Sequence, residues 1–564
     1  MGRLFAALAV LAASLAPIAP SSPAGAPADL VFRHGAVYTV DNARSWAEAV
    51  AVSGGRIVFV GTDAAAAQWI GPQTKVVDLS GKMLLPAFHD SHVHPVSGGM
   101  EALECDLHGL ASTDAVLDTI RSYAWSHPDA AWIRGGGWDL TLFPEGSPSR
   151  LALDRVVPDR PALLDASDGH SSWANSKALA IAGVTKATPD PPHGRIERDA
   201  SGQPSGTLRE EAVHLVSRHL PPRTAAEHEA GLRRGLEVAS GFGLTSLEEA
   251  DASAADLAAY AALDARGALT ARVSASIGVH TDEGLGDLPR LRDLRAKYRS
   301  KRLHADAVKI FADGVIETRT AAVLEPYFGY GDDRGKTNLE PAAFRALAAA
   351  LDKDGFQIHV HAIGDRAVRD TLDALEFAQK ANGVRDSRHH VAHLELIDPA
   401  DIPRFRRLGV VANFQPFWAN GDEYITKMTE PELGPARSQW IYPIASVEAA
   451  GGITAFGSDW SVSSMNPLDG IEVAITHRDP STGPGSAWLP KEQITLPDAI
   501  AGYTIRGAYL DFTEKETGSI EVGKAADLVV LDRNLFDVPP SQIHEAKVLW
   551  TLLEGKEVYR AKGF

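Results

Sequence analysis

The chain has 564 residues, of which 45% are hydrophobic, and its 55 Lys and Arg against 73 Asp and Glu give a formal net charge of −18. This length allows a large core and more than one domain, and the acidic balance excludes an overall basic surface for nucleic acid. The single cysteine, Cys105, excludes an intramolecular disulfide framework and any cysteine-rich metal site. A bound metal would therefore need His, carboxylate or lysine-derived ligands.

Residues 1–28 predict a signal peptide. The stretch "MGRLFAALAVLAASLAPIAP" has one basic residue, Arg3, before an apolar run, and an A-x-A cleavage site ends at Ala28. The alternative is a membrane anchor, but the run is short for a spanning helix and ends in Pro and Ser. We therefore expect a periplasmic or secreted protein without a membrane span in its mature part.

Both ends of the mature chain have the pattern of β-structure. Short Val-rich runs broken by glycine turns fill residues 29–82, for example "AEAVAVSGGRIVFVG". Residues 511–564 show the same pattern in "GSIEVGKAADLVVLD". We expect a small β-sandwich that is built from both chain ends.

Between these ends, in residues 83–510, strand patterns alternate with helical ones such as "PAAFRALAAALDKDGF". Strands with mostly helical connections predict a (β/α)₈ TIM-like barrel in the α/β class. The first connection is too long for one helix, so residues 96–241 should be a large insertion after barrel strand 1. The predicted strands are 83–89, 243–249, 272–279, 307–312, 357–361, 390–394, 410–415 and 454–458.

Polar residues stand at or just past the carboxyl ends of these strands. His92 and His94, in "LLPAFHDSHVHP", point the same way if the segment is extended, so both imidazoles can reach one ion. The carboxyl ends of barrel strands carry the chemistry of this fold, and imidazole and carboxylate ligands suit zinc. Manganese, iron or cobalt would fit too, as one or two ions. The other candidates at strand ends are Lys309, Asp313, His359, His361, His389, His390, His393 and Asp459.

Lys309 lies mid-strand among apolar residues in "DAVKIFADG", on the same face as Asp313. A bare buried ammonium is costly, so it needs a partner. Two explanations stay open: an ion pair with Asp313, or carbamylation by carbon dioxide, which would make Lys309 an anionic ligand between two metals.

The sequence resembles the metal-dependent amidohydrolase superfamily, and most of all the amidohydrolase family 3 branch, which includes N-substituted formamide deformylases. The matching stretches are "LLPAFHDSHVH", "SDGHSSWANSKAL", "VKIFADG", "IHVHAIGDRAV", "VAHLEL", "FGSDW" and "GSIEVGKAADLVVLD". They are spread over nearly all of the mature chain. The resemblance implies a distorted (β/α)₈ barrel with a β-sandwich from both chain ends.

The resemblance also implies roles for individual residues. Asp459 would contact the metal and shuttle the proton, and Lys309 matches a lysine that is carboxylated in binuclear members. The metal ligands would be His92, His94, Lys309, His361 (rather than His359), His393 and Asp459. His170 and Asn175 match the insertion motif and would contact substrate. Trp138, Asp313 and Trp418 are further candidates for substrate contact, although the aromatic residues could instead pack the insertion against the barrel.

The expected reaction is hydrolysis of a non-peptide carbon–nitrogen bond in a small amide-type substrate by metal-activated water, with Asp459 as the proton shuttle. Because fold does not fix function, a deaminase, lactonase, isomerase or decarboxylase on the same scaffold stays open. A non-catalytic exported binding protein is a third alternative, which the complete set of histidines and Asp459 disfavours. The sequence leaves a homodimer open.

Overall fold

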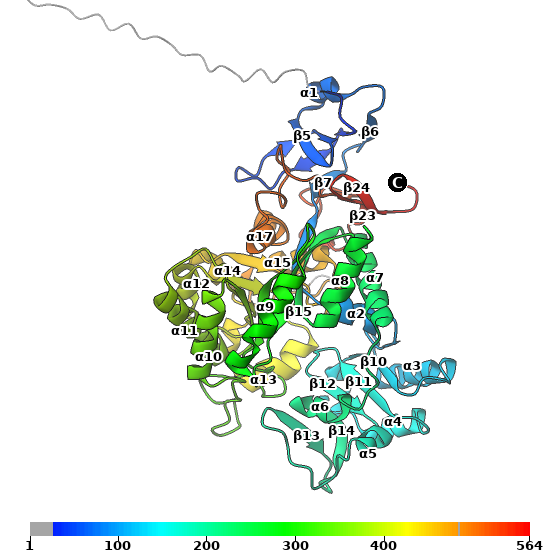
Figure 1. Cartoon of the computed structure of the whole chain (residues 1–564), viewed down its shortest axis with the longest axis vertical. Helices are drawn as coiled ribbons and strands as arrows, with labels where there is room; N and C mark the ends of the chain where they lie inside the picture. The colour runs from blue at the N-terminus through cyan, green and yellow to red at the C-terminus, as the bar shows by residue number, and fades with distance from the viewer. Residues whose placement is uncertain (1–25, 483–484) are drawn as a thin grey trace, which may run out of the picture.

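The computed structural model describes residues 26–482 and 485–564 (Figure 1). Residues 1–25 of the predicted signal peptide lie outside the described part. Ala28, at the predicted cleavage site, is 3% exposed, and its backbone N–H donates to the carbonyl of Trp69 over 2.8 Å. Among the described residues, no helix has the length and apolar character that crossing a membrane requires.

The centre of the molecule is an eight-stranded parallel sheet that is nearly closed into a barrel, which confirms the predicted fold. The gap between the first and last strands is bridged just past their ends, where the N–H of Asp459 donates to the carbonyl of His92 over 2.7 Å and that of His94 to the carbonyl of Trp460 over 3.0 Å. The strands are, in sheet order, β8 (Phe88–Val93), β15 (Leu244–Ala252), β16 (Arg272–Gly278), β17 (Leu303–Phe311), β18 (Gln357–Ala362), β19 (His390–His393), β20 (Val411–Phe414) and β21 (Thr454–Phe456).

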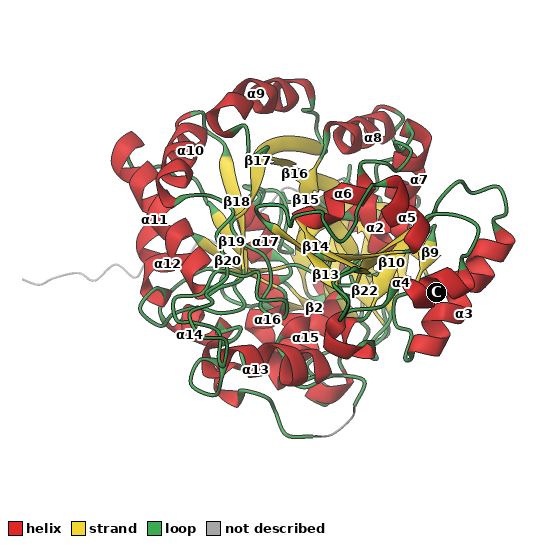
Figure 2. Ribbon diagram, turned by 90° about the horizontal axis from the view of Figure 1, so that it is seen from below, coloured by secondary structure: helices red, strands yellow, loops and turns green. Residues whose placement is uncertain are grey.

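Helices surround the barrel sheet, as Figure 2 shows. The predicted helix "PAAFRALAAALDKDGF" corresponds to α10, which follows β17, and α11 follows β18. These helices cover the outer face of the sheet, so the barrel strands are buried on both faces and their sequences are nearly continuous apolar runs. The main helices of this layer are α7 (Ala225–Gly241), α8 (Ala254–Ala265), α9 (Leu288–Lys297), α10 (Pro341–Lys353), α11 (Asp365–Asn382), α12 (Ile402–Leu408), α14 (Ile444–Ala449) and α15 (Pro467–Thr476).

The predicted first barrel strand, 83–89, is two strands in the structure. Its first half, β7 (Met83–Pro86), pairs antiparallel with β22 (Leu528–Leu531) in a sheet at the chain ends, and only β8 belongs to the barrel. The apolar run is continuous across the break, so no change of period marks where the chain changes sheets. As a result His92 lies within the barrel strand and His94 just past it.

Two sheets are built from the chain ends, and Figure 1 shows their blue and red strands together at one end of the barrel. They share a core in which the rings of Phe32 and Trp550 lie 5.6 Å apart. One sheet has the order β5 (Arg56–Gly61), β4 (Ala49–Ser53), β1 (Leu30–Arg33) and β6 (Lys75–Asp78). The other has the order β24 (Lys556–Arg560), β23 (Val548–Leu553), β22, β7, β2 (Ala36–Tyr38) and β3 (Trp46–Ala47).

The insertion lies at the opposite end of the barrel, in cyan in Figure 1, and has its own six-stranded sheet. It is smaller than the predicted 96–241, because α2 (Pro95–Glu101) and α7 pack against each other beside the barrel. A Cβ on Gly99 would come within 1.9 Å of the carbonyl oxygen of Gly231, so these helices touch through backbone. The sheet has the order β13 (Gly194–Arg198), β14 (Pro204–Glu210), β12 (Ser171–Ala174), β11 (Ala162–Ala166), β10 (Ile133–Trp138) and β9 (Cys105–Asp106).

Candidate metal centre and active site

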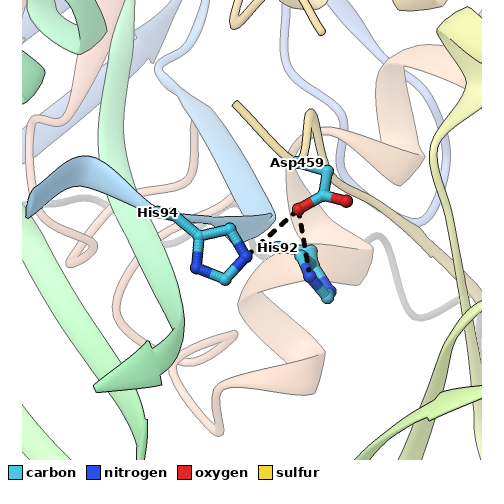
Figure 3. A group of neighbouring side chains, drawn as sticks. All are labelled: His92, His94 and Asp459. Carbon is cyan, nitrogen blue, oxygen red and sulfur yellow. Dashed lines mark ion pairs between the residues drawn. The ribbon is translucent and has the colours of Figure 1, made fainter. Parts of the chain in front are cut away.

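His92, His94 and Asp459 meet at the carboxyl end of the barrel (Figure 3). Oδ1 of Asp459 lies 3.4 Å from Nε2 of His92 and 3.2 Å from Nε2 of His94. The side chains of His92 and Asp459 are buried, and that of His94 is largely buried. Donor atoms this close together can share one ion, and two imidazoles with one carboxylate are a common donor set for zinc.

His361, His393 and Lys309 surround this group. The ring of His393 lies 4.7 Å from that of His92 and 4.6 Å from that of His361, and Nζ of Lys309 lies 3.2 Å from Nε2 of His92. The predicted ligands on or just after β17, β18, β19 and β21 thus lie beside those on or just after β8. His393 and Asp459 have positive φ angles of 76° and 55°, and such backbone conformations in non-glycine residues concentrate at functional sites.

The proposed ion pair between Lys309 and Asp313 is wrong. Asp313 is 1% exposed, and its carboxylate accepts from the backbone N–H groups of Ala322, Ile363 and Gly364 over 2.9–3.0 Å. Lys309, also 1% exposed, instead faces His92. Burial lowers the pKa of Lys309 to about 8, although nearby carboxylates led by Asp459 oppose the shift.

Burial sets the protonation of the histidines that face the centre. It lowers the pKa of His92 to about 3, assisted by the charge of Lys309, and it holds the pKa values of His361 and His393 well below the usual value. Neutral imidazoles keep a lone pair for a metal. Burial opposes ionisation of Asp459, but His92 and then His94 outweigh it and hold its pKa well below the usual value. His94 differs, because burial opposes its protonation but Asp459 and then Glu249 outweigh burial and raise its pKa to about 10. Three neutral imidazoles beside an ionised carboxylate fit a divalent cation, whose binding would displace the proton of His94.

A chain of hydrogen bonds beneath the centre fixes the tautomer of His92. Ser276 Oγ donates to Glu248 Oε1 over 3.1 Å, so it accepts from Nδ1–H of His359, also at 3.1 Å. Nε2 of His359 is then unprotonated and accepts from Nδ1–H of His92 at 3.0 Å. His92 therefore carries its proton on Nδ1, which leaves the lone pair of Nε2 directed at Asp459 and Lys309, where a metal would bind.

Glu248, His359 and His390 form a second buried group deeper in the barrel. Oε1 of Glu248 lies 3.2 Å from Nδ1 of His359 and 3.0 Å from Nε2 of His390, and all three residues are fully buried. The sequence singled out His359 and His390 but not Glu248, which lies within the apolar strand "LTSLEEADA". Two consecutive carboxylates in a barrel strand are the signal that could have found it.

Two cavities, of about 320 Å³ and 360 Å³, open from the centre and share His361, His393 and Asp459 in their walls. His170 of the insertion also lines both. Its ring lies 5.2 Å from that of His361, and its Nδ1 lies 3.0 Å from Oε2 of Glu210. Burial opposes protonation of His170, but Glu210 outweighs it and raises the pKa to about 9.

Of the predicted substrate contacts, the structure brings His170 and Trp418 to the site. Trp418 lines the smaller cavity and stacks on His393, with ring centroids 5.6 Å apart and planes 10° apart. The sequence thus predicted Trp418 as part of an aromatic pocket wall, because this residue follows a barrel strand.

The structure corrects the predictions for Trp138, Asn175 and Asp313. Trp138 is fully buried in the core of the insertion and donates through Nε1 to the carbonyl of Leu164 over 2.9 Å. Asn175 is also fully buried and caps α5 (Ser176–Ile181), with its amide oxygen and nitrogen both bonded to backbone. Asp313, as described above, anchors three backbone N–H groups. These three side chains hold the scaffold and do not face either cavity.

The fold and the site together define a metal-dependent hydrolase of the TIM-barrel type, and comparison with known proteins agrees. A family described as "Amidohydrolase family" matches residues 75–559, so the chain belongs to the amidohydrolase family. It is therefore an enzyme of the metal-dependent class that hydrolyses carbon–nitrogen bonds.

Several similar proteins cover almost the whole chain. Protein LONG AFTER FAR-RED 3 of Arabidopsis thaliana is 32% identical over 95% of this chain and 92% of its own length. N-substituted formamide deformylase of Arthrobacter pascens is 30% identical over 95% of this chain and 99% of its own length. A solved structure of an uncharacterized metal-dependent hydrolase from Pyrococcus horikoshii has a TM-score of 0.72 at 22% identity and covers 91% of this chain and 99% of its own, which shows the same fold.

Proposed function

We propose that the protein hydrolyses a non-peptide, amide- or formamide-type carbon–nitrogen bond in a small molecule. The observation that carries the proposal is the position of Asp459, whose Oδ1 lies within 3.4 Å of His92 and His94 at the place where two cavities meet. The similarity to N-substituted formamide deformylase supports the bond type. We infer a divalent ion, with zinc favoured by the donor set, held by His92, His94, Lys309, His361, His393 and Asp459.

When bound there, the ion would activate a water molecule and polarise the substrate carbonyl. Asp459 is ionised, so it can accept a proton from the attacking water. After attack, the protonated Asp459 can deliver that proton to the leaving nitrogen, which departs as an amine. The same carboxylate thus serves as base and then as acid, and its position between His92 and His94 keeps it beside the reacting atoms.

His170 supplies the complementary positive charge from the insertion. Its ion pair with Glu210 keeps the imidazolium oriented, and Glu210 Oε1 accepts from the hydroxyl of Thr320 over 2.7 Å. A fixed imidazolium at the cavity wall would stabilise negative charge that develops on the substrate carbonyl oxygen. We therefore assign His170 the role of an electrostatic stabiliser.

We further propose that Lys309 is carboxylated. Its side chain is buried in the wall of the larger cavity, and the lowered pKa of about 8 makes the neutral, nucleophilic amine accessible. The neutral nitrogen would add to the carbon of carbon dioxide and lose a proton, which gives a carbamate anion. Such an anion beside neutral His92 would turn an unfavourable buried cation into a ligand.

A product screen tests the proposed function. The metal-loaded protein is incubated with a panel of N-substituted formamides, other amides, aminopyrimidines and lactones, and released amine, ammonia and acid are measured separately. Amine release from formamides or amides supports the proposal. Release of ammonia alone, or lactone opening alone, would assign another reaction to the scaffold.

We also propose that the chain is exported, on the basis of residues 1–28. Sequencing the N-terminus of the protein recovered from the periplasm or medium of its own host checks this. A new N-terminus near Asp29 is expected, and a full-length chain found only inside the cell would contradict it.

A further inference from the structure

The smaller of the two cavities has an unusual combination of walls. Phe417, Trp418, Tyr424 and Tyr442 provide aromatic surface, and carboxylates project among them. An ordinary apolar pocket for an aryl or alkyl group would not need buried acids, because each buried charge is costly without a partner. The buried carboxylates therefore indicate that the ligand of this cavity compensates their negative charge.

Three of the carboxylates in this wall lie close together around one tyrosine. Glu317 and Glu395 are 8% and 3% exposed and lie against each other, and Asp168 follows β11 of the insertion. Tyr424 lines the same cavity, and burial, followed by the charges of Glu317, Asp168 and Glu395, raises the pKa of its hydroxyl well above the usual value. Acidic groups from the barrel and from the insertion thus meet around one tyrosine.

One of these carboxylates has an oxygen that no protein group satisfies: Oδ2 of Asp168 is buried and has no hydrogen-bond partner among the described residues. Glu317 accepts from the hydroxyl of Thr429, and it faces Glu395 closely enough for the two carboxyl groups to share one proton, so this pair keeps one negative charge. Buried polar oxygens are nearly always paired, so Oδ2 of Asp168 is a position where a donor from outside the chain is expected.

No lysine or arginine side chain lines this cavity in the described part of the chain, and the imidazolium of His170 is engaged by Glu210. The larger cavity differs, since Arg134 and Arg223 lie in its wall beside acidic residues, and Arg223 is paired with Glu104. Basic side chains thus balance acidic ones in the larger cavity, whereas no lysine or arginine of the described residues does so in the smaller one.

We propose that the smaller cavity binds a protonated amine, so that the substrates carry an ammonium group attached through an apolar or aryl segment. The carboxylates of Glu317, Glu395 and Asp168 accept its N–H groups, and the aromatic rings hold the attached segment and interact with the charge. The inference rests on the proposed hydrolase function only in that the bound amine is called a substrate, because binding of the amine requires no turnover.

The test measures binding of matched probes by calorimetry. Phenethylammonium and its neutral counterpart 2-phenylethanol have the same shape, and each is titrated into the zinc-loaded and the metal-free protein. The ammonium should bind at least about tenfold more tightly, in both forms, because the proposed site consists of protein groups. Equal affinities would overturn the proposal. A preference that disappears without zinc would also overturn it, because the amine would then be a metal ligand.

Two variants locate the preference. Asp168→Asn and the double variant Glu317→Gln/Glu395→Gln keep the shapes of the side chains and remove their negative charge, and each should lose most of the preference for the ammonium probe. Glu325→Gln, whose side chain is 76% exposed, is the matched control and should leave the preference unchanged. If Glu325→Gln lowers the preference as much as the cavity variants do, overall charge explains the effect and the proposed site is wrong.

Because amide hydrolysis is not measured here, the two hypotheses can fail separately. A tight ammonium site without amine release in the product screen would refute the hydrolase assignment and leave the binding site standing. Amine release from neutral formamides with no preference for the ammonium probe would do the reverse.

Discussion

The interior of the barrel contains two groups of polar side chains that differ in what they face. The upper group, His94, His361, His393 and Asp459, lines the cavities at the carboxyl end of the strands. The lower group, Glu248, His359 and His390, lies deeper, is fully buried and lines neither cavity. Both contain imidazoles and a carboxylate within hydrogen-bonding distance.

Depth along the strand, and not residue type, separates the side chains that reach the cavities from those that lie beneath them. On β18, His359 and His361 point to the same side and differ by one pleat repeat, yet only His361 reaches a cavity. His92 joins the two groups, since its Nδ1 faces His359 and its Nε2 faces Asp459. The lower group would therefore act on the chemistry only through the orientation and tautomer of His92.

The largest effect is expected at the acid–base residue of the upper group. Asp459→Asn should lower kcat by about 10³-fold, because the amide cannot take up and return the proton. Steady-state kinetics with the best substrate of the product screen measure it, beside metal content to show that the centre is still loaded. Turnover that survives essentially unchanged would show that the proposed proton shuttle is wrong.

Matched truncations in the two groups should affect different properties. His361→Ala should reduce bound metal while lowering the free energy of unfolding of the metal-free protein by about 1 kcal/mol or less, because the side chain borders an open cavity. His390→Ala should keep the metal and cost about 2 kcal/mol or more, because it leaves a void beside the buried Glu248.

Elemental analysis and denaturant unfolding of both variants provide the readout. Loss of metal from His390→Ala as complete as that from His361→Ala would refute the proposed difference between the upper and lower groups. Equal destabilisation of the two variants would refute it as well.

The link through His92 predicts an intermediate effect. His359→Leu should weaken zinc binding by about 10–100-fold, since it removes the acceptor that fixes the tautomer of His92. Competition with a chromogenic chelator gives the dissociation constant. His389→Leu is a suitable control, because His389 is equally buried but its hydrogen bonds go to Asp352 and the backbone of Ile358 and not to His92. An equal loss in both variants would argue for general disruption of the barrel.

The smallest effect is expected at the aromatic neighbour of the upper group. Trp418→Leu removes the ring stacked on His393 while keeping an apolar wall. We expect kcat/KM to fall by roughly tenfold or less, mainly through KM, because the change affects substrate contact and one stacking pair. A loss as large as that of Asp459→Asn would mean that Trp418 takes part in holding the metal centre.

The barrel could be predicted because its strands are buried on both faces and its helices are amphipathic. The predicted range 357–361 lies within β18, for example, and "PAAFRALAAALDKDGF" corresponds to α10. The point at which the chain passes from β7, in the sheet at the chain ends, to the barrel strand β8 could not be predicted, because the apolar run continues without a change in period.

For the site, the strand-end histidines and Asp459 could be proposed from the sequence because their strands are parallel and all end at the same edge. The role of Asn175 could not be separated from ligand binding, because an N-cap and a ligand contact use the same amide side chain. The acidic wall was missed because Glu317, Glu395 and Asp168 come from three distant segments, which only the folded chain brings together.

The central claim is that the upper group binds metal with the help of Lys309. The most direct test is the metal content per chain of the purified mature protein by elemental analysis, beside a Lys309→Ala variant. Two metals per chain, falling to one or none in the variant, are the result that a carboxylated Lys309 in a binuclear hydrolase predicts. No metal after loading with zinc and with manganese would contradict the account, and one metal in both proteins would remove Lys309 from the ligands.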